Sequence, residues 1–127
     1  MRAVLDTSIL IGGKQLPAGI EASISAVSIS ELHFGLLVAP DEDVRAERVA
    51  RMGLIEARFP NPLPLDDRVA RAWAQLQAAV VRRGAQPRTR MADLAIAATA
   101  IAHGAVLITA NTKDLKVVED LVQIRTL

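Results

Sequence analysis

The sequence contains no cysteine and very few aromatic residues. The absence of cysteine excludes disulfide bonds and cysteine-ligated zinc, and it fits a protein of the reducing cytoplasm. The aromatic residues are limited to Trp73, Phe34 and Phe59, so the 51% hydrophobic content comes mainly from Ala, Val, Ile and Leu. Such side chains favour helices packed tightly on a sheet, and 127 residues suffice for a real core. We expect a single domain spanning residues 1–127.

The chain also lacks a strong net charge and a long apolar run. Its formal net charge of +1 gives no global field that would indicate nucleic acid or acidic partners. The most apolar segment, residues 91–108, is interrupted by Asp93 and His103, so it cannot supply the roughly 20 apolar residues of a membrane span. Asp6 and two glycines likewise interrupt the amino-terminal apolar run, which does not resemble a signal peptide. We therefore expect a soluble, cytoplasmic protein.

Acidic residues are absent between Asp67 and Asp93, and this gap is rich in arginine. The arginines of the gap are Arg68, Arg71, Arg82, Arg83, Arg88 and Arg90. A solvated helix face and loop would explain them, and a local patch that contacts nucleic acid is the alternative.

Apolar stretches and turn signals predict strands that alternate with helices. Strands are expected at residues 2–5, 23–27, 63–65, 106–109 and 122–124. Helices are expected at residues 29–37, 41–58, 67–83 and 91–103. A capping box of Ser28 and Glu31 would begin the first helix, and Asp66 would cap the third. The alternation is typical of an α/β fold with a mostly parallel central sheet flanked by helices.

Four acidic residues are expected at one edge of that sheet. Asp6 follows the first strand, Glu31 lies just past the second, and Asp114 lies just past the strand expected at residues 106–109. The carboxyl ends of parallel strands share one edge, where ligands collect. The helix at residues 91–103 leads to the amino end of the strand at residues 106–109. The helix therefore begins at the opposite edge of the sheet, where the strands have their carboxyl ends, and Asp93 lies near that beginning.

Each acid has an ordinary structural explanation when it is taken alone, such as hydrogen bonds in a turn, a helix cap or compensation of a helix dipole. Together the acids would repel one another and lose hydration unless a cation compensates them. Oxygen ligands favour Mg²⁺ or Mn²⁺, whereas zinc would favour His or Cys, and His33 and His103 are poorly placed. Such metals in an acidic pocket are suited to hydrolysis of phosphodiester bonds.

Three segments of the chain follow one another in a characteristic order: "VLDTSIL", "SAVSISELHFGL" and "MADLAIAATAIAHGAVLITANTKDL". In this order they resemble the PIN-domain ribonucleases and, among them, the VapC-type toxins of toxin–antitoxin modules. The resemblance covers nearly the whole chain and implies a PIN-domain-like three-layer fold. It also implies an endoribonuclease toxin, a cognate VapB-type antitoxin, a homodimer, and contact with DNA only through the antitoxin. Gly35 would permit close helix packing, either at a dimer interface or in the core.

The resemblance assigns roles to individual residues. Asp6 matches the family's first acid, Glu31 the acid of S-x-x-E-L, Asp93 that of D-x-x-I-A-A, and Asp114 that of T-x-N-x-x-D. These four would bind Mg²⁺ or Mn²⁺ and carry the catalysis. Small polar residues that would support the pocket are Thr7, Ser8, Thr109 and Asn111.

Two positions depart from the family's pattern. Ala110 stands where relatives commonly have Arg, and Leu115 where they often have Phe. The first departure removes a possible phosphate contact and leaves other arginines to bind RNA. The candidate RNA-binding residues are Arg82, Arg83, Arg88 and Arg90.

The same residues bear on three other functions. A phosphatase of the haloacid dehalogenase type would require a second acid two residues after Asp6, where Ser8 stands. A response-regulator receiver domain would require paired acids after the first strand, and only one is present. The alternative from a different class is a non-catalytic PIN-like domain that binds RNA or protein. Loss of acids would favour it, and this chain keeps all four.

Overall fold

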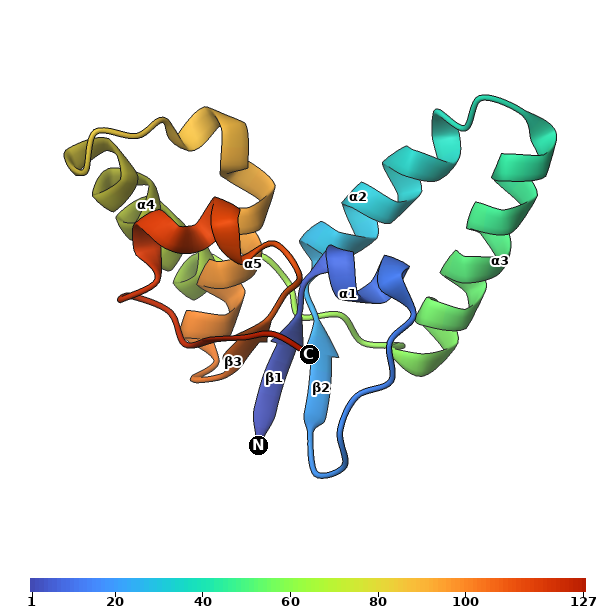
Figure 1. Ribbon diagram of the computed structural model, residues 1–127, viewed down its shortest axis with the longest axis horizontal. Coiled ribbons are helices and arrows are strands. Elements are labelled where there is room, and N and C mark those ends of the chain that lie inside the picture. The colour runs from blue at the N-terminus through green and yellow to red at the C-terminus, as the bar shows by residue number, and fades with distance from the viewer.

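The computed structural model describes all 127 residues and contains one four-stranded sheet. The strands are β1 (Arg2–Leu5), β2 (Glu21–Ile24), β3 (Val106–Ile108) and β4 (Ile124–Arg125). Neighbouring strands all run parallel, in the order β2-β1-β3-β4. The predicted α/β class with a parallel sheet is therefore confirmed, and Figure 1 shows the sheet at the foot of the molecule between two groups of helices.

The helices form two groups on either side of the sheet. The α-helices are α1 (Thr7–Gly12), α2 (Ala26–Leu37), α3 (Glu42–Arg58), α4 (Asp67–Arg82) and α5 (Met91–Ala102), and the 3₁₀ helices are η1 (Pro87–Arg90) and η2 (Thr112–Val118). In Figure 1, α4, α5 and η2 make one lobe and α1, α2 and α3 make the other. None of these helices combines the length and apolarity needed to cross a membrane.

The side chains of β1 divide the hydrophobic core in two. Val4 packs in a cluster with α4 and α5 that includes Leu94. Ala3 and Leu5 belong to a second cluster, with α2 and α3, that includes Ile55. Successive residues of a strand face opposite sides of the sheet. The two clusters therefore fill the two faces, which gives the predicted three layers of helix, sheet and helix.

The structure corrects the predicted boundary between the second strand and the helix that follows it. β2 ends and α2 begins three residues earlier than expected. Ser25 is the N-cap of α2, and its Oγ accepts a hydrogen bond from Val27 N at 3.0 Å. The predicted capping box is wrong, because Ser28 and Glu31 both lie inside the helix. Their side chains are therefore available for other contacts.

Other elements also differ from the prediction. No strand forms at residues 63–65, where Leu63 makes only an isolated bridge with Ser25. The prolines on either side of Leu63 have no N–H to donate to a ladder. The last strand is β4 rather than residues 122–124. The helical segments α1, η1 and η2 were not predicted, because segments of 6, 4 and 7 residues are too short for a clear periodic pattern.

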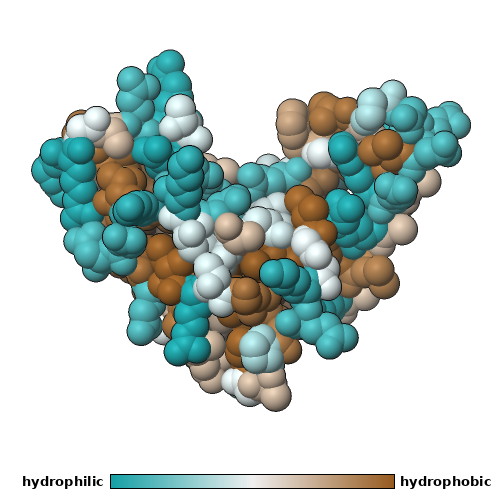
Figure 2. Space-filling view, viewed as in Figure 1, coloured by the Kyte–Doolittle hydropathy of each residue, from teal (hydrophilic) through white to brown (hydrophobic).

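The carboxyl-terminal part of α2 carries exposed apolar side chains. Phe34 is 65% exposed, Leu37 59% and Val38 55%. Figure 2 shows hydrophobic residues on the surface at the upper end of the α2–α3 lobe. A Cβ added at Gly35 would meet no atom within 4 Å, so core packing, one of the two roles considered for this glycine, is wrong.

The substitution Leu94→Ala tests the assignment of the core. Leu94 is 0% exposed within the cluster of α4 and α5, and a Leu to Ala change in a core lowers the free energy of unfolding by about 2–5 kcal/mol. Urea unfolding followed by circular dichroism measures the loss. Leu54→Ala is the matched control, because Leu54 is 74% exposed and the same truncation should change stability by less than about 0.5 kcal/mol. Equal losses in the two variants would contradict this description of the core.

Candidate active site

Two neighbouring strands end side by side at Asp6 and Thr109. Asp6 follows β1 and is the N-cap of α1, and Thr109 follows β3. The Asp6 N–H donates to Ile108 O at 2.9 Å, which ties the two strand ends together. The chain moves from β1 to β2 on one side, whereas β3 lies on the other side of β1. Such a switch in strand order is where parallel α/β sheets bind ligands.

The carboxylate of Asp6 is buried, with 3% exposure, and it accepts three hydrogen bonds. Its Oδ1 accepts from Thr7 N at 2.8 Å. Its Oδ2 accepts from Ser8 Oγ at 2.9 Å and from Thr109 Oγ1 at 2.7 Å. These donors replace the water that burial removes, which is the condition under which a buried carboxylate is tolerated.

The two hydroxyls that donate to Asp6 are themselves oriented by backbone N–H groups. Ala110 N donates to Ser8 Oγ at 3.1 Å, and Asn111 N donates to Thr109 Oγ1 at 2.9 Å. Because each hydroxyl oxygen accepts from the backbone, its proton is directed at the carboxylate. Asn111 was predicted to support the pocket, and it acts here through its backbone while its side chain is exposed.

Glu31 is half-buried on α2 and is held by Thr7. Thr7 Oγ1 lies 2.6 Å from Glu31 Oε1 and 2.9 Å from Ser28 Oγ. Ser28 was not predicted at this site, since the sequence pattern assigned it to a helix cap. A signal was present, because Ser28 and Glu31 are three residues apart and such residues share one face of a helix.

Asp93 differs from Asp6 because it has no hydrogen-bond donor of this kind. It lies half-buried in the first turn of α5. Burial, and after it the negative charges of Asp6, Glu31 and Asp114, raise the pKa of Asp93 from its ordinary 3.8 to about 6. Arg90 opposes the shift with its positive charge. The pKa of Asp93 therefore reflects both its burial and the three acids near it.

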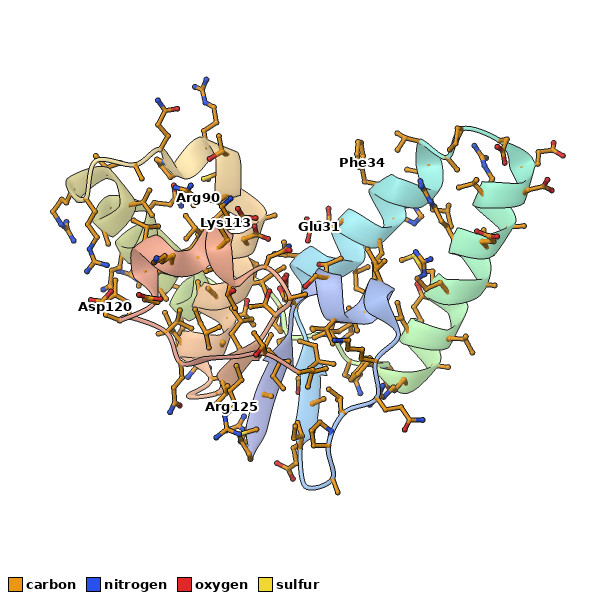
Figure 3. All side chains as sticks on the ribbon, in the orientation of Figure 1. Glu31, Phe34, Arg90, Lys113, Asp120 and Arg125 are labelled. Carbon is orange, nitrogen blue, oxygen red and sulfur yellow. The ribbon has the colours of Figure 1, made fainter.

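The four predicted acids come from separate parts of the fold. Asp6 follows β1, Glu31 is on α2, Asp93 begins α5, and Asp114 is exposed in η2. The structure brings the other three close enough to Asp93 for their charges to act on it. Figure 3 shows Glu31 on one side of the notch between the lobes and Lys113, next to Asp114 in sequence, on the other.

The donor chemistry of this edge fits a hard divalent cation, but the side chains are not gathered around one point. The four acids offer only oxygen atoms, the ligands that Mg²⁺ and Mn²⁺ prefer. His33 is exposed, and His103 is the C-cap of α5. No group of three or more His, Cys, Asp or Glu side chains is arranged to hold an ion. Binding one would require side-chain rotations that bring carboxylate oxygens together.

The four candidate RNA-binding arginines have different environments. Arg83 donates to Val117 O at 2.6 Å and to both carboxylate oxygens of Asp120, at 2.7 and 3.0 Å. The hydrogen bond from Arg83 lowers the pKa of Asp120, and the same bond raises the pKa of Arg83. Arg83 therefore connects the end of α4 to the segment around Val117 and Asp120. Arg90 is half-buried beside the acids, and Arg82 and Arg88 are exposed, as Arg83 is, but without its ion pair.

Sequence comparisons relate the chain to proteins of one family. The PIN domain family profile matches residues 3–121. Ribonuclease VapC4 of Mycobacterium tuberculosis is 38% identical over 114 residues, which cover 85% of this chain and 85% of that protein. Ribonuclease VapC5 of the same organism is 36% identical over 112 residues, which cover 84% of this chain and 80% of that protein.

Solved structures with similar folds extend the comparison. VapBC-5 from Mycobacterium tuberculosis, a member of the VapBC family of toxin-antitoxin systems, matches with a TM-score of 0.81 and 31% identity, covering 99% of this chain and 97% of that chain. VapBC2 from Rickettsia felis, bound to a DNA fragment from its promoter, matches with a TM-score of 0.80 over 100% of this chain and 99% of that chain. At 19% identity the second likeness concerns the fold alone.

The raised pKa of Asp93 predicts a pH-dependent effect of Asp93→Asn on the metal-free protein. The pKa is about 6 when folded and 3.8 ordinarily, so ionised Asp93 destabilises the fold above about pH 6. This penalty fades as the pH falls from 6 toward 3.8. Asp93→Asn should raise the Tm at pH 8 by about 3–6 °C, after the full effect is halved for solvent screening. The gain should shrink at pH 4.5.

Thermal unfolding by circular dichroism, in chelator, measures both values. Asp43→Asn is the matched control, since it removes the same charge from an exposed residue in the first turn of α3. The control should show a small shift that does not follow the same pH profile. A gain for Asp93→Asn that is equal at pH 4.5 and pH 8 would contradict the described environment of Asp93.

Proposed function

The chain belongs to the PIN-domain family, in which it groups with VapC proteins, and on that premise we propose that it is a metal-dependent endoribonuclease. The observation that carries the proposal is the environment of Asp93. Burial raises its pKa, and three other acids from separate parts of the fold raise it as well. Crowded carboxylates are expected where a cation compensates them.

Each of the four acids has a place in this proposal. Asp6, Glu31, Asp93 and Asp114 would hold Mg²⁺ or Mn²⁺ through their oxygen atoms. Asp6 is the rigid member, because three hydrogen bonds fix its carboxylate. Glu31 is oriented by Thr7, whereas Asp93 and Asp114 are free to turn toward an ion. A bound ion of this kind supplies activation of water and stabilisation of the leaving oxygen in phosphodiester hydrolysis.

Positive charge beside the acids supports RNA as the substrate. Arg90 already acts on Asp93, and Figure 3 shows Lys113 on the same side of the notch. Cations at these positions can contact phosphates on either side of the one that is cut. Ala110 leaves no cation at its own position, so the proposal assigns these contacts to Arg90 and Lys113, with exposed Arg82 and Arg88 further along.

The partner we propose is a VapB-type antitoxin that neutralises the chain as the toxin of a type II module. Relatives solved as VapBC toxin–antitoxin systems, at up to 31% identity, support this partner. Contact with promoter DNA would then occur through the antitoxin. We further propose a homodimer, for which the exposed side chains of Phe34, Leu37 and Val38 offer apolar surface. The open space beside Gly35 is consistent with such an interface.

Cleavage of total cellular RNA by the purified chain tests the proposed activity. The chain should cut RNA in the presence of Mg²⁺ or Mn²⁺, and the cleavage should stop when a chelator is added. Asp6→Asn and Asp93→Asn should each lower the rate by at least about a hundredfold, the order of loss seen when a charge-stabilising group is removed. Both variants should retain the far-ultraviolet circular dichroism of the folded protein.

Asp43→Asn is the control for the loss of one negative charge, and it should cut normally. Unchanged cleavage in both Asp6→Asn and Asp93→Asn would reject the four-carboxylate site. If the chain cuts no RNA under any condition while it remains folded and free of antitoxin, the non-catalytic binding function is favoured instead.

The separate environments of Arg90 and Arg83 predict different effects on RNA binding. Binding of labelled single-stranded RNA is measured in chelator, where no cleavage occurs, over a series of salt concentrations. Arg90→Ala should weaken binding and reduce the slope of log K against log salt by about 0.7, the value for one phosphate contact. Arg83→Ala should leave RNA binding unchanged and lower the Tm, because Arg83 is bonded to Asp120 and Val117. Equal losses of affinity would contradict this division.

A further inference from the structure

Ser28 has a buried hydroxyl that the proposed function does not yet use. Its exposure is 0%, and the helix cap predicted for it does not form. Ser28 precedes Glu31 by three residues on α2, so the two side chains share a face. Thr7, at the start of α1, contacts both, with its Oγ1 2.9 Å from Ser28 Oγ and 2.6 Å from Glu31 Oε1. The three groups form one chain of hydrogen bonds between two helices.

The direction of this chain follows from counting protons. Thr7 has a single hydroxyl proton, and an ionised Glu31 carboxylate can only accept. The shorter, charge-assisted bond takes that proton, so Thr7 donates to Glu31. Ser28 must then donate its own proton to Thr7 Oγ1. The chain therefore runs from Ser28 through Thr7 to Glu31.

This arrangement differs from the one around Asp6. The hydroxyls of Ser8 and Thr109 are directed at Asp6 by backbone N–H groups, which a substitution to alanine leaves in place. The hydroxyl of Thr7 is directed at Glu31 by a side chain, that of Ser28. A single substitution at position 28 can therefore release Thr7 without touching Glu31.

We propose that Ser28 is a positioning residue for the metal site. Its donation to Thr7 holds the Thr7 hydroxyl toward Glu31 Oε1, and this contact fixes the direction in which Glu31 presents Oε2. Ser28 itself would contact neither the ion nor RNA. The inference rests on the proposed function, because it concerns how one of the four carboxylates is oriented toward Mg²⁺ or Mn²⁺.

The test is a double-mutant cycle between Ser28 and Thr7 with two readouts. Calorimetric titration with Mn²⁺ in the absence of RNA gives the metal affinity, and cleavage of RNA gives kcat and KM. Ser28→Ala should weaken Mn²⁺ binding and lower kcat, each about tenfold, with KM unchanged, as is usual when a group that orients a metal ligand is lost. The variant carrying Ser28→Ala and Thr7→Val should match Thr7→Val alone, because Ser28 acts only through Thr7.

Two further variants separate positioning from packing. Thr7→Ser keeps the hydroxyl and should keep Mn²⁺ affinity within about threefold, whereas Thr7→Val keeps the shape and should lose about tenfold. Ser30→Ala is the control, since Ser30 is an exposed serine on the same helix and should have no effect. If Ser28→Ala fails to fold, as judged by urea unfolding, the comparison of Thr7→Ser with Thr7→Val decides, and equal affinities overturn the proposal.

Unchanged Mn²⁺ affinity in Ser28→Ala, or additive losses in the double variant, would also overturn it. Asp6→Asn separates this failure from failure of the proposed function. If Asp6→Asn abolishes cleavage while Ser28→Ala behaves as the unsubstituted chain, the ribonuclease stands and only the positioning role is rejected. If Asp6→Asn and Asp93→Asn both cut RNA normally, the proposed site itself is rejected.

Discussion

The buried carboxylate of Asp6 is the constraint on which the rest of the site depends. A carboxylate with 3% exposure is tolerated only when donors surround it, and the fold supplies three. These donors require the end of β1, the start of α1 and the end of β3 to meet at one point, which the parallel pairing of β1 with β3 achieves. The position of Asp6 is therefore a property of the sheet, and the other acids are arranged relative to it.

Charge at this edge is compensated unevenly. Asp6 and Glu31 are matched by hydrogen-bond donors, whereas Asp93 has none, and burial together with the nearby acids raises the pKa of Asp93. Under the proposed function this difference would favour cation binding, because a fixed carboxylate would supply geometry and an unsatisfied one would supply attraction. No group of three or more acidic or histidine side chains is arranged around one point, and of the four acids only Asp6 and Glu31 are held by hydrogen bonds.

The sequence was sufficient to predict the parallel sheet, the strand that precedes Asp6 and the helices that carry Glu31 and Asp93, because strand ends and helix starts follow from apolar patterns and Gly or Pro signals. It was not sufficient to predict Ser28 at the site. A serine three residues before a glutamate matches a capping box equally well, and the choice depends on Ser25, whose hydroxyl caps α2 first. The short helix α1 was missed for lack of length, although its residues Thr7 and Ser8 supply two of the three donors to Asp6. Local patterns cannot distinguish such cases, because tertiary contacts decide them.

The arginines between Asp67 and Asp93 illustrate the same limit. The sequence placed Arg83 and Arg90 in one basic patch, but in the structure the two side chains have different partners. Arg90 lies beside Asp93 and reduces its charge penalty. Arg83 joins the end of α4 to Val117 and Asp120, and thus fixes the segment that carries Asp114. Asp120 is 37 residues away in sequence, so only the folded chain reveals the pair. Positive charge therefore acts on the acids in two ways: Arg90 lies beside Asp93, and Arg83 holds the segment that follows Asp114.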